Sequence, residues 1–127
     1  MNIEKLIFIR KFFNKSQFLT FMDYISHSEE KNFFKSQINY FYSLIKQVPN
    51  LYAQDCKQEK IAYLHYFTPS IDWYVLEIDN NTNEMFGLVK MYGNYPEYGY
   101  FYMSELISVN AEFDMYFEPI NLKNIKI

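Results

Sequence analysis

The spacing of apolar residues along the chain changes near residue 60. Before that point apolar side chains recur at steps of three and four, the period of a helix, and after it they recur at every second position, the period of a strand. The clearest helical run ends before Pro49, a residue that cannot continue a helix, and its apolar members are Phe34, Ile38, Phe41, Ile45 and Val48. The pattern therefore predicts helices first and strands second.

We expect three helices in the helical part. The first covers residues 3–13. The second begins at Ser16 and the third at Ser28, since serine is a favoured residue at helix N-caps. Glu29 and Glu30 follow Ser28, where the positive end of the helix dipole favours acidic side chains.

The second part contains five short segments with strand-like alternation, and the segment Ser104–Val109 is expected to form a short helix before the last of them. Short strands that follow one another without crossover helices favour an antiparallel meander. The predicted fold is α+β, with the N-terminal helices packed on one face of a mostly antiparallel sheet of about five strands. We expect one domain over residues 1–127, with a helical part at 1–47 and a sheet part at 60–119. The expected strands are 61–67, 72–79, 84–91, 98–103 and 113–118.

The short turns allow the strand register to be predicted. This register places the alternating tyrosines Tyr98, Tyr100 and Tyr102 on the apolar face beneath the helices, with Tyr102 opposite Gly87. A slip of one residue in any strand would exchange its two faces. The expected facing pairs are Phe67 with Asp72, Asp79 with Glu84, and Met91 with Tyr98.

The opposite face of the predicted sheet mixes aromatic and charged residues, a composition typical of partner surfaces. Trp73 is expected to face Lys90, which would place a cation over the indole ring. Two readings remain open: this face binds a partner or a second copy of the chain, or the C-terminal segment with Ile120, Leu122 and Ile125 covers it. The candidate partner-binding residues are Tyr66, Trp73, Glu77, Phe86 and Lys90.

Composition and charge narrow the function classes. Half of the 127 residues are hydrophobic, which is enough for one core without disulfides, and the single cysteine, Cys56, fits the cytoplasm. Five charged residues between Glu4 and Lys15 leave no uncharged run longer than four there, so we expect no signal peptide, spanning helix or membrane partner. The net charge is −3, and the sequence has no dense basic patch of the kind that duplex nucleic-acid binders carry.

No catalytic or metal-binding motif stands out. Cys56 has no recognisable nucleophile motif around it, and His65, which alternates with aromatic residues, is expected to be a hydrogen-bonded core histidine. Glu77 and Asp79 share one side of a strand and suit acid/base work, but acids beside a hairpin are commonly just solvated. We therefore expect no enzyme, no cofactor and no metal. A small enzyme with an acidic site that uses Glu77, Asp79 or Glu97 remains a further alternative.

Several short motifs resemble a family with no assigned function. The chain is similar, over about residues 48–122, to a domain of unknown function found in short proteins of bacterial plasmids, conjugative elements and phages. It differs from the family where Tyr98 replaces a usual leucine and Phe113 a common arginine, and the residues before Leu44 have no counterpart. The matching motifs are Phe67-Thr68-Pro69, Trp73-Tyr74, Phe86-Gly87-Leu88-Val89, Pro96-Glu97, Gly99-Tyr100, Ser104-Glu105-Leu106 and Tyr116-Phe117-Glu118-Pro119.

The resemblance implies a mobile-element context. Together with the aromatic face, it leads us to expect a non-enzymatic accessory protein that binds a host protein or complex, with inhibition of an anti-phage defence system such as CRISPR as a candidate role. The alternative is an accessory of plasmid or phage replication or transfer that stacks single-stranded nucleic acid on the same aromatic residues.

Overall fold

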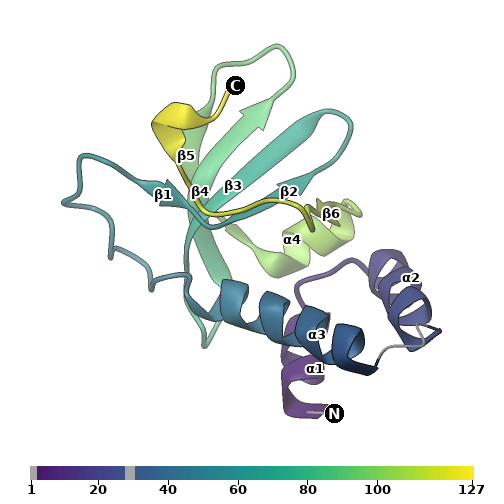
Figure 1. The fold of residues 1–127 in the computed structure, drawn as a ribbon. Coiled ribbons are helices and arrows are strands. Elements are labelled where there is room, and N and C mark those ends of the chain that lie inside the picture. Colours follow the sequence, from purple (N-terminus) through teal and green to yellow (C-terminus); the bar gives the residue numbers. More distant parts are fainter. Residues whose placement is uncertain (1–2, 28–30) are drawn as a thin grey trace. The chain divides into compact units, whose positions relative to one another are not determined.

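The computed structural model describes residues 3–27 and 31–127, which divide into two compact units, Met1–Gln47 and Val48–Ile127 (Figure 1). The α+β class and the order of helices, sheet and short helix are as predicted. None of the helices described is both long and apolar enough to cross a membrane.

The first unit consists of α1 (Ile3–Arg10), α2 (Lys15–Ser26) and α3 (Lys31–Lys46). Its core includes the rings of Phe13, Phe21 and Phe41, whose centroids lie 5.6–5.7 Å apart. The predicted cap of the second helix was wrong: Asn14 caps α2, with its side-chain oxygen accepting from the Gln17 N–H at 2.7 Å. The predicted cap of the third helix, Ser28, and Glu29 and Glu30 lie outside the described residues.

The second unit contains a five-stranded antiparallel sheet in the order β5-β4-β3-β2-β6. β1 (Ile61–Ala62) and β7 (Ile120–Asn121) pair with each other in a separate two-stranded sheet. The short helix α4 (Met103–Ser108) follows β5, as predicted. A 3₁₀ turn at Leu122–Asn124 comes after β7. The strands of the sheet are β2 (Leu64–Phe67), β3 (Ile71–Ile78), β4 (Glu84–Met91), β5 (Glu97–Tyr102) and β6 (Glu112–Phe113).

Between β2 and β3 the register is as predicted, with Phe67 facing Asp72. Between β3 and β4 it agrees with the prediction only near the turn, where the N–H of Asp79 donates to the carbonyl of Glu84 at 2.8 Å. A β-bulge between Val75 and Glu77 then shifts the pairing by one residue. The predicted contact of Trp73 with Lys90 was therefore wrong, because Trp73 faces Val89 and Lys90 faces Asp72.

The register between β4 and β5 differs from the prediction by three residues. Tyr98 faces Leu88 instead of Met91, and Tyr102 faces Glu84 instead of Gly87. Hairpin register depends on the connection, and here the chain between the paired residues Val89 and Glu97 forms a wide loop rather than a tight turn. Because the offset is odd, the tyrosines lie on the same face as Phe86 and Leu88.

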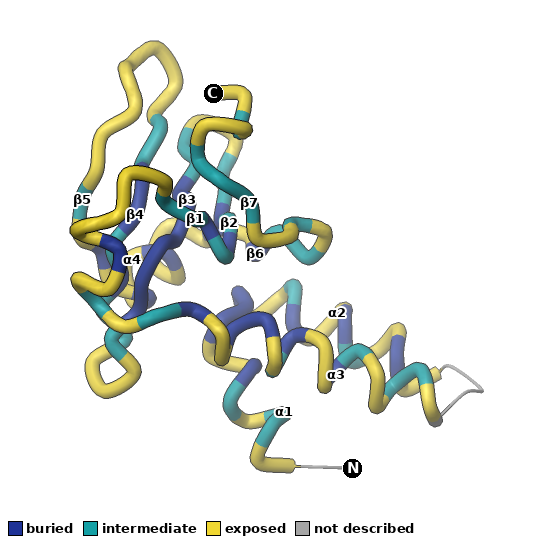
Figure 2. The backbone as a smooth tube through the Cα atoms, turned by 60° about the vertical axis from the view of Figure 1, so that its left-hand side comes forward, coloured by how far each residue is buried: buried dark blue, intermediate teal, exposed yellow. Residues whose placement is uncertain are grey.

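The two faces of the sheet are consequently sorted differently from the prediction. Tyr66 and Trp73 are buried, whereas the three tyrosines of β5 are exposed (Figure 2). The C-terminal segment does cover part of the sheet (Figure 1), as one of the two open readings proposed. Leu122 and Ile125 pack against the cluster that contains Tyr74, so the covered face is that of Tyr74 rather than that of Trp73. The core cluster on the covered face consists of Ala62, Tyr74, Leu76 and Leu88, with Phe86, Phe117, Leu122 and Ile125 packed against it.

Candidate partner-binding surface

A row of exposed aromatic rings runs along the end strand of the sheet. Tyr98 and Tyr100 are each 52% exposed and Tyr102 is 42% exposed, so about half of each residue is open to a ligand. We call this surface the tyrosine strip, and its members are Tyr52, Phe86, Tyr98, Tyr100 and Tyr102.

Contacts between the rings hold the tyrosine strip together. Phe86 of β4 stacks on Tyr98 with centroids 5.7 Å apart and planes at 10°, and it contacts Tyr100 at 4.9 Å. Tyr52, from the loop before β1, approaches Tyr100 at 6.5 Å. These four rings thus form a continuous surface of preset shape, which lowers the entropy cost of binding, and Tyr102 extends it along β5.

A buried carboxylate positions the loop that carries Tyr52. Glu77 is only 1% exposed, and its two oxygens accept from the N–H groups of Tyr52 at 2.8 Å and Gln54 at 2.7 Å. The Gln54 side chain adds bonds to the backbone of Ile61 and to the carbonyl of Leu76. These bonds hold Tyr52 in a left-handed backbone conformation, with φ of 73°.

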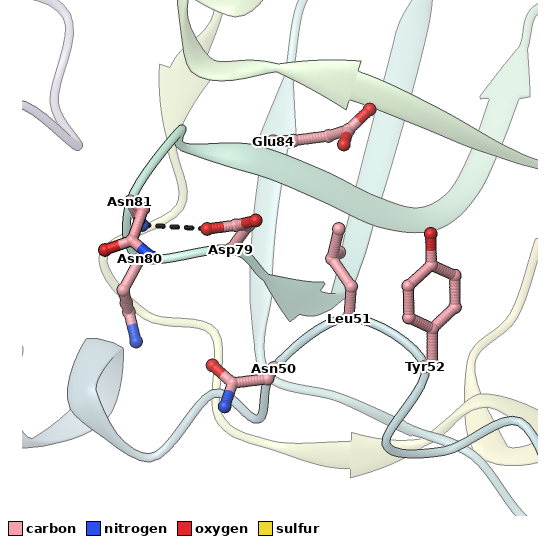
Figure 3. A pocket seen from close by; sticks show the side chains of 7 residues that line it. All are labelled: Asn50, Leu51, Tyr52, Asp79, Asn80, Asn81 and Glu84. Carbon is pink, nitrogen blue, oxygen red and sulfur yellow. Dashed lines mark hydrogen bonds between the residues drawn. The ribbon is translucent and has the colours of Figure 1, made fainter.

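Next to the tyrosine strip the surface forms a hollow of about 570 Å³. We call it the acidic hollow (Figure 3). Its two carboxylates come from Asp79 and Glu84 at either end of the β3–β4 turn, and Tyr52 borders both the hollow and the strip. The residues that line it are Asn50, Leu51, Tyr52, Asp79, Asn80, Asn81 and Glu84.

The two carboxylates of the acidic hollow differ in their bonding. Asp79 Oδ1 accepts from the N–H groups of Asn81 at 2.8 Å and Thr82 at 3.3 Å, so this oxygen organises the turn. The carboxylate of Glu84 has no hydrogen-bond or ion-pair partner within residues 3–27 and 31–127. Glu84 is therefore available to a positively charged group.

Two carboxylates lie close enough to the tyrosine strip to act on it. The pKa of the Tyr100 phenol is raised, first by desolvation, then by Tyr52, and then by the charges of Asp55 and Glu77. These two charges would also attract a cation to the same place. The surface is suited to positively charged ligands.

The sequence-predicted site residues divide between the inside and the surface. Tyr66 is fully buried, which raises the pKa of its phenol, and Trp73 and Glu77 are also buried. Phe86 and Lys90 are partly exposed, and Phe86 belongs to the tyrosine strip. The Lys90 ammonium donates to the carbonyls of Met91, at 2.9 Å, and Asn94, so it braces the loop before β5.

The sequence interpretation missed the tyrosines of β5 and the residues Tyr52 and Glu84. The alternation of the tyrosines was visible, but it cannot say which face of the sheet is covered. No sequence pattern marks Tyr52 as part of the surface, because its position depends on the hydrogen bond from its backbone N–H to Glu77, 25 positions away.

His65 occupies a polar cluster on the covered face. Its Nδ1 lies 2.9 Å from Asp114 Oδ2 and its Nε2 lies 2.7 Å from Asp72 Oδ1, while its ring stacks on Tyr74 at 4.6 Å. The side chain is 13% exposed, so the prediction of a hydrogen-bonded histidine was confirmed. With both nitrogens occupied, His65 connects β2, β3 and the chain after β6.

The remaining candidate catalytic groups are dispersed. Cys56 is exposed, and within the described chain no three His, Cys, Asp or Glu side chains converge in a way that could hold a metal ion. Glu97 and Glu118 are exposed.

The fold and this surface define a small α+β protein with an aromatic, acid-bordered sheet edge. Residues 42–120 match the family described as protein of unknown function (DUF2958), and the chain belongs to this family. Neither the curated proteins nor the solved structures gave a match.

Proposed function

We propose that the protein is a non-enzymatic binding protein whose tyrosine strip and acidic hollow dock a basic segment of a partner protein. The observation that carries the proposal is the exposed, preassembled row of rings beside the unpaired carboxylate of Glu84. Aromatic residues of this kind often act as interface anchors.

The chemistry of the surface favours arginine or lysine in the partner. A guanidinium can stack on a tyrosine face and simultaneously donate to a carboxylate. Tyr52 and Glu84 border the same hollow and offer both groups. Residues 48–127 carry five Lys and Arg against eleven Asp and Glu, so long-range attraction also favours a basic partner.

The state of the other polar groups supports binding over catalysis. The carboxylate of Glu77 is occupied by two backbone N–H groups, and both ring nitrogens of His65 are occupied by carboxylates. General acids and bases need access to a substrate, and these groups serve the fold instead.

The biological setting that we propose follows from the family resemblance. The protein would be an accessory of a mobile genetic element in the cytoplasm, and its partner a host protein, with a component of an anti-phage defence system as one candidate. The protein would inhibit such a partner by covering its functional surface, which requires no catalytic group.

Binding of short peptides tests the proposal directly. Fluorescence anisotropy should show that an arginine-containing peptide binds more tightly than the same peptide with glutamine at each arginine. Tyr100→Ala and Glu84→Gln should each raise the Kd of the peptide about tenfold, which corresponds to a loss of about 1.4 kcal/mol of binding free energy. Tyr116→Ala and Glu112→Gln, which change exposed residues in or just after β6, at the opposite end of the sheet from β5, should leave binding unchanged.

Equal affinity for the arginine and glutamine peptides would refute a basic partner. Capture from host cells with the wild-type chain and the two strip variants would then identify proteins that depend on the same surface. Sedimentation of the chain alone distinguishes self-association, since a homodimer through the strip would dissociate in Tyr100→Ala.

A further inference from the structure

The outer edge of the sheet is open along β5. Within the described chain β5 pairs with β4 alone, and Figure 2 shows it at the rim of the sheet with most of its backbone exposed. It is six residues long, whereas β6 at the opposite end of the sheet has two. Natural proteins usually protect a long edge strand with lysine, proline or a bulge, and the segment Glu97–Tyr102 contains none of these.

A hydrogen bond at the end of β5 shows which of its backbone groups point outward. The N–H of Met103 donates to the carbonyl of Asn83 at 3.3 Å, and these two residues continue the β4–β5 register by one step. Bonded pairs alternate with unbonded pairs in an antiparallel ladder, so Gly99 bonds to β4. Tyr98 and Tyr100 occupy the unbonded positions, and their N–H and C=O groups point away from β4.

The bonds between β3 and β4 give the same assignment. The N–H of Asp79 donates to the carbonyl of Glu84, so the backbone of Glu84 faces β3, and that of Phe86, two residues further on, faces the same way. The next residue, Gly87, therefore faces β5, where it pairs with Gly99. The outward backbone groups of β5 thus belong to the residues whose rings form the tyrosine strip.

These outward groups are open to a ligand. In residues 3–27 and 31–127 no loop backbone bonds to the N–H or C=O of Tyr98 or Tyr100. The open edge ends at Tyr102, the N-cap of α4, since the carbonyl of an N-cap residue accepts the first bond of its helix. The edge therefore offers two donors and two acceptors directly beside the half-exposed rings.

We propose that the basic segment of the partner binds in an extended conformation, as an antiparallel sixth strand along β5. The inference rests on the proposed function for the charge of this segment, and it adds the conformation and the spacing of the basic residues. Segment residues opposite Tyr98 and Tyr100 exchange backbone hydrogen bonds with them and carry side chains on the same face as the rings. Arginines at alternate positions then lie over the tyrosine strip, close to Glu84, which faces Tyr102.

The charge of the chain argues against a second copy as the added strand. Residues 48–127 carry five Lys and Arg against eleven Asp and Glu, so pairing of two β5 strands would bring like charges together. The basic excess of the chain lies in residues 1–47, with seven Lys and Arg against four Asp and Glu, and the described part of this stretch is mainly helical. Helices bond their backbone groups internally and cannot extend a sheet.

Peptides with methylated backbone nitrogens test the added strand. A short peptide with arginines at alternate positions is compared, by fluorescence anisotropy with the full chain, with two methylated forms of the same charge. Methylation of two arginine nitrogens should weaken binding about tenfold or more, because these N–H groups face the carbonyls of Tyr98 and Tyr100. Methylation of two intervening residues should keep the Kd within about twofold of the parent, because their nitrogens face solvent.

Amide hydrogen exchange of the full chain gives an independent measurement. In the free chain the N–H groups of Tyr98 and Tyr100 should exchange about tenfold or more faster than those of Gly99 and Phe101, which bond to β4. With the peptide at about 100 times its Kd, exchange at Tyr98 and Tyr100 should slow by about tenfold or more. Gly99 and Phe101 are the internal control.

Failure of this inference is distinguishable from failure of the proposed function. Equal binding of the two methylated peptides, or unchanged exchange at Tyr98 and Tyr100, overturns the added strand even where arginine is preferred over glutamine. Weakening confined to the peptide methylated between its arginines overturns the antiparallel arrangement. Equal binding of the arginine and glutamine peptides refutes the basic partner, whatever methylation does. A dimer of the free chain that already protects Tyr98 and Tyr100 makes a second copy the occupant, and an absence of binding by every peptide overturns both proposals.

Discussion

At the scale of single residues, Glu77 shows how burial changes the role of a charged group. Its alternation with Trp73 and Val75 places it on a face that the sequence interpretation took to be exposed. In the structure it is buried and binds the backbone of a loop through two hydrogen bonds. The difference arises from the β-bulge, since one extra residue in a strand leaves no mark in the hydrophobic pattern.

Glu77→Gln should destabilise the sheet unit. One of the two backbone N–H groups would face an amide NH₂ instead of an acceptor, and a buried unsatisfied donor costs about 1–3 kcal/mol. Urea denaturation should show a loss of free energy of unfolding in that range. Glu97→Gln, which changes an exposed carboxylate on β5, should change it by less than about 0.5 kcal/mol. Equal effects of the two variants would contradict the structural role of Glu77.

At the scale of elements, the positions of strands were more predictable than their pairing. Period-two alternation located the strands to within about one residue for β3, β4 and β5. The last predicted strand, 113–118, was wrong beyond Phe113, because Asp114 turns the chain through its bonds to His65 and Tyr116. Register depends on the bulge and the loop before β5, and it decides which tyrosines are exposed.

Gly87 and Gly99 face each other on β4 and β5 but should respond differently to substitution. A Cβ atom on Gly87 would lie 1.9 Å from the carbonyl oxygen of Tyr74, a backbone atom that cannot move aside. A Cβ on Gly99 would meet nothing within 4 Å. Thermal unfolding should show Gly87→Ala destabilised by about 2 kcal/mol or more, and Gly99→Ala within about 0.5 kcal/mol of wild type. A tolerated Gly87→Ala would contradict the bulged register.

At the scale of the whole molecule, the chain consists of two units with opposite charge and separate contacts. The hydrophobic period changes near residue 60, some residues after the boundary between the units at Gln47 and Val48, and the α+β class followed from the order of elements. The candidate surfaces were less predictable. The tyrosine strip required the register between β4 and β5, which the sequence pattern does not carry.

Residues 48–127 should fold without the helical unit. They contain the complete five-stranded sheet, the core cluster around Tyr74 and Leu76, and most of the family match. A fragment of this length should show β-sheet circular dichroism and a cooperative thermal transition. It should bind the arginine peptide like the full chain. A fragment without a cooperative transition would mean that the helical unit is needed for folding.

The single tryptophan of the chain lies in the sheet unit, where Trp73 is 8% exposed. Indole emission therefore reports only on that half of the molecule, whereas ellipticity at 222 nm comes mainly from the other half. Denaturation curves recorded with the two signals would coincide if the halves melt together and separate if they do not. The sequence thus supplies its own spectroscopic label, with no need for an engineered probe.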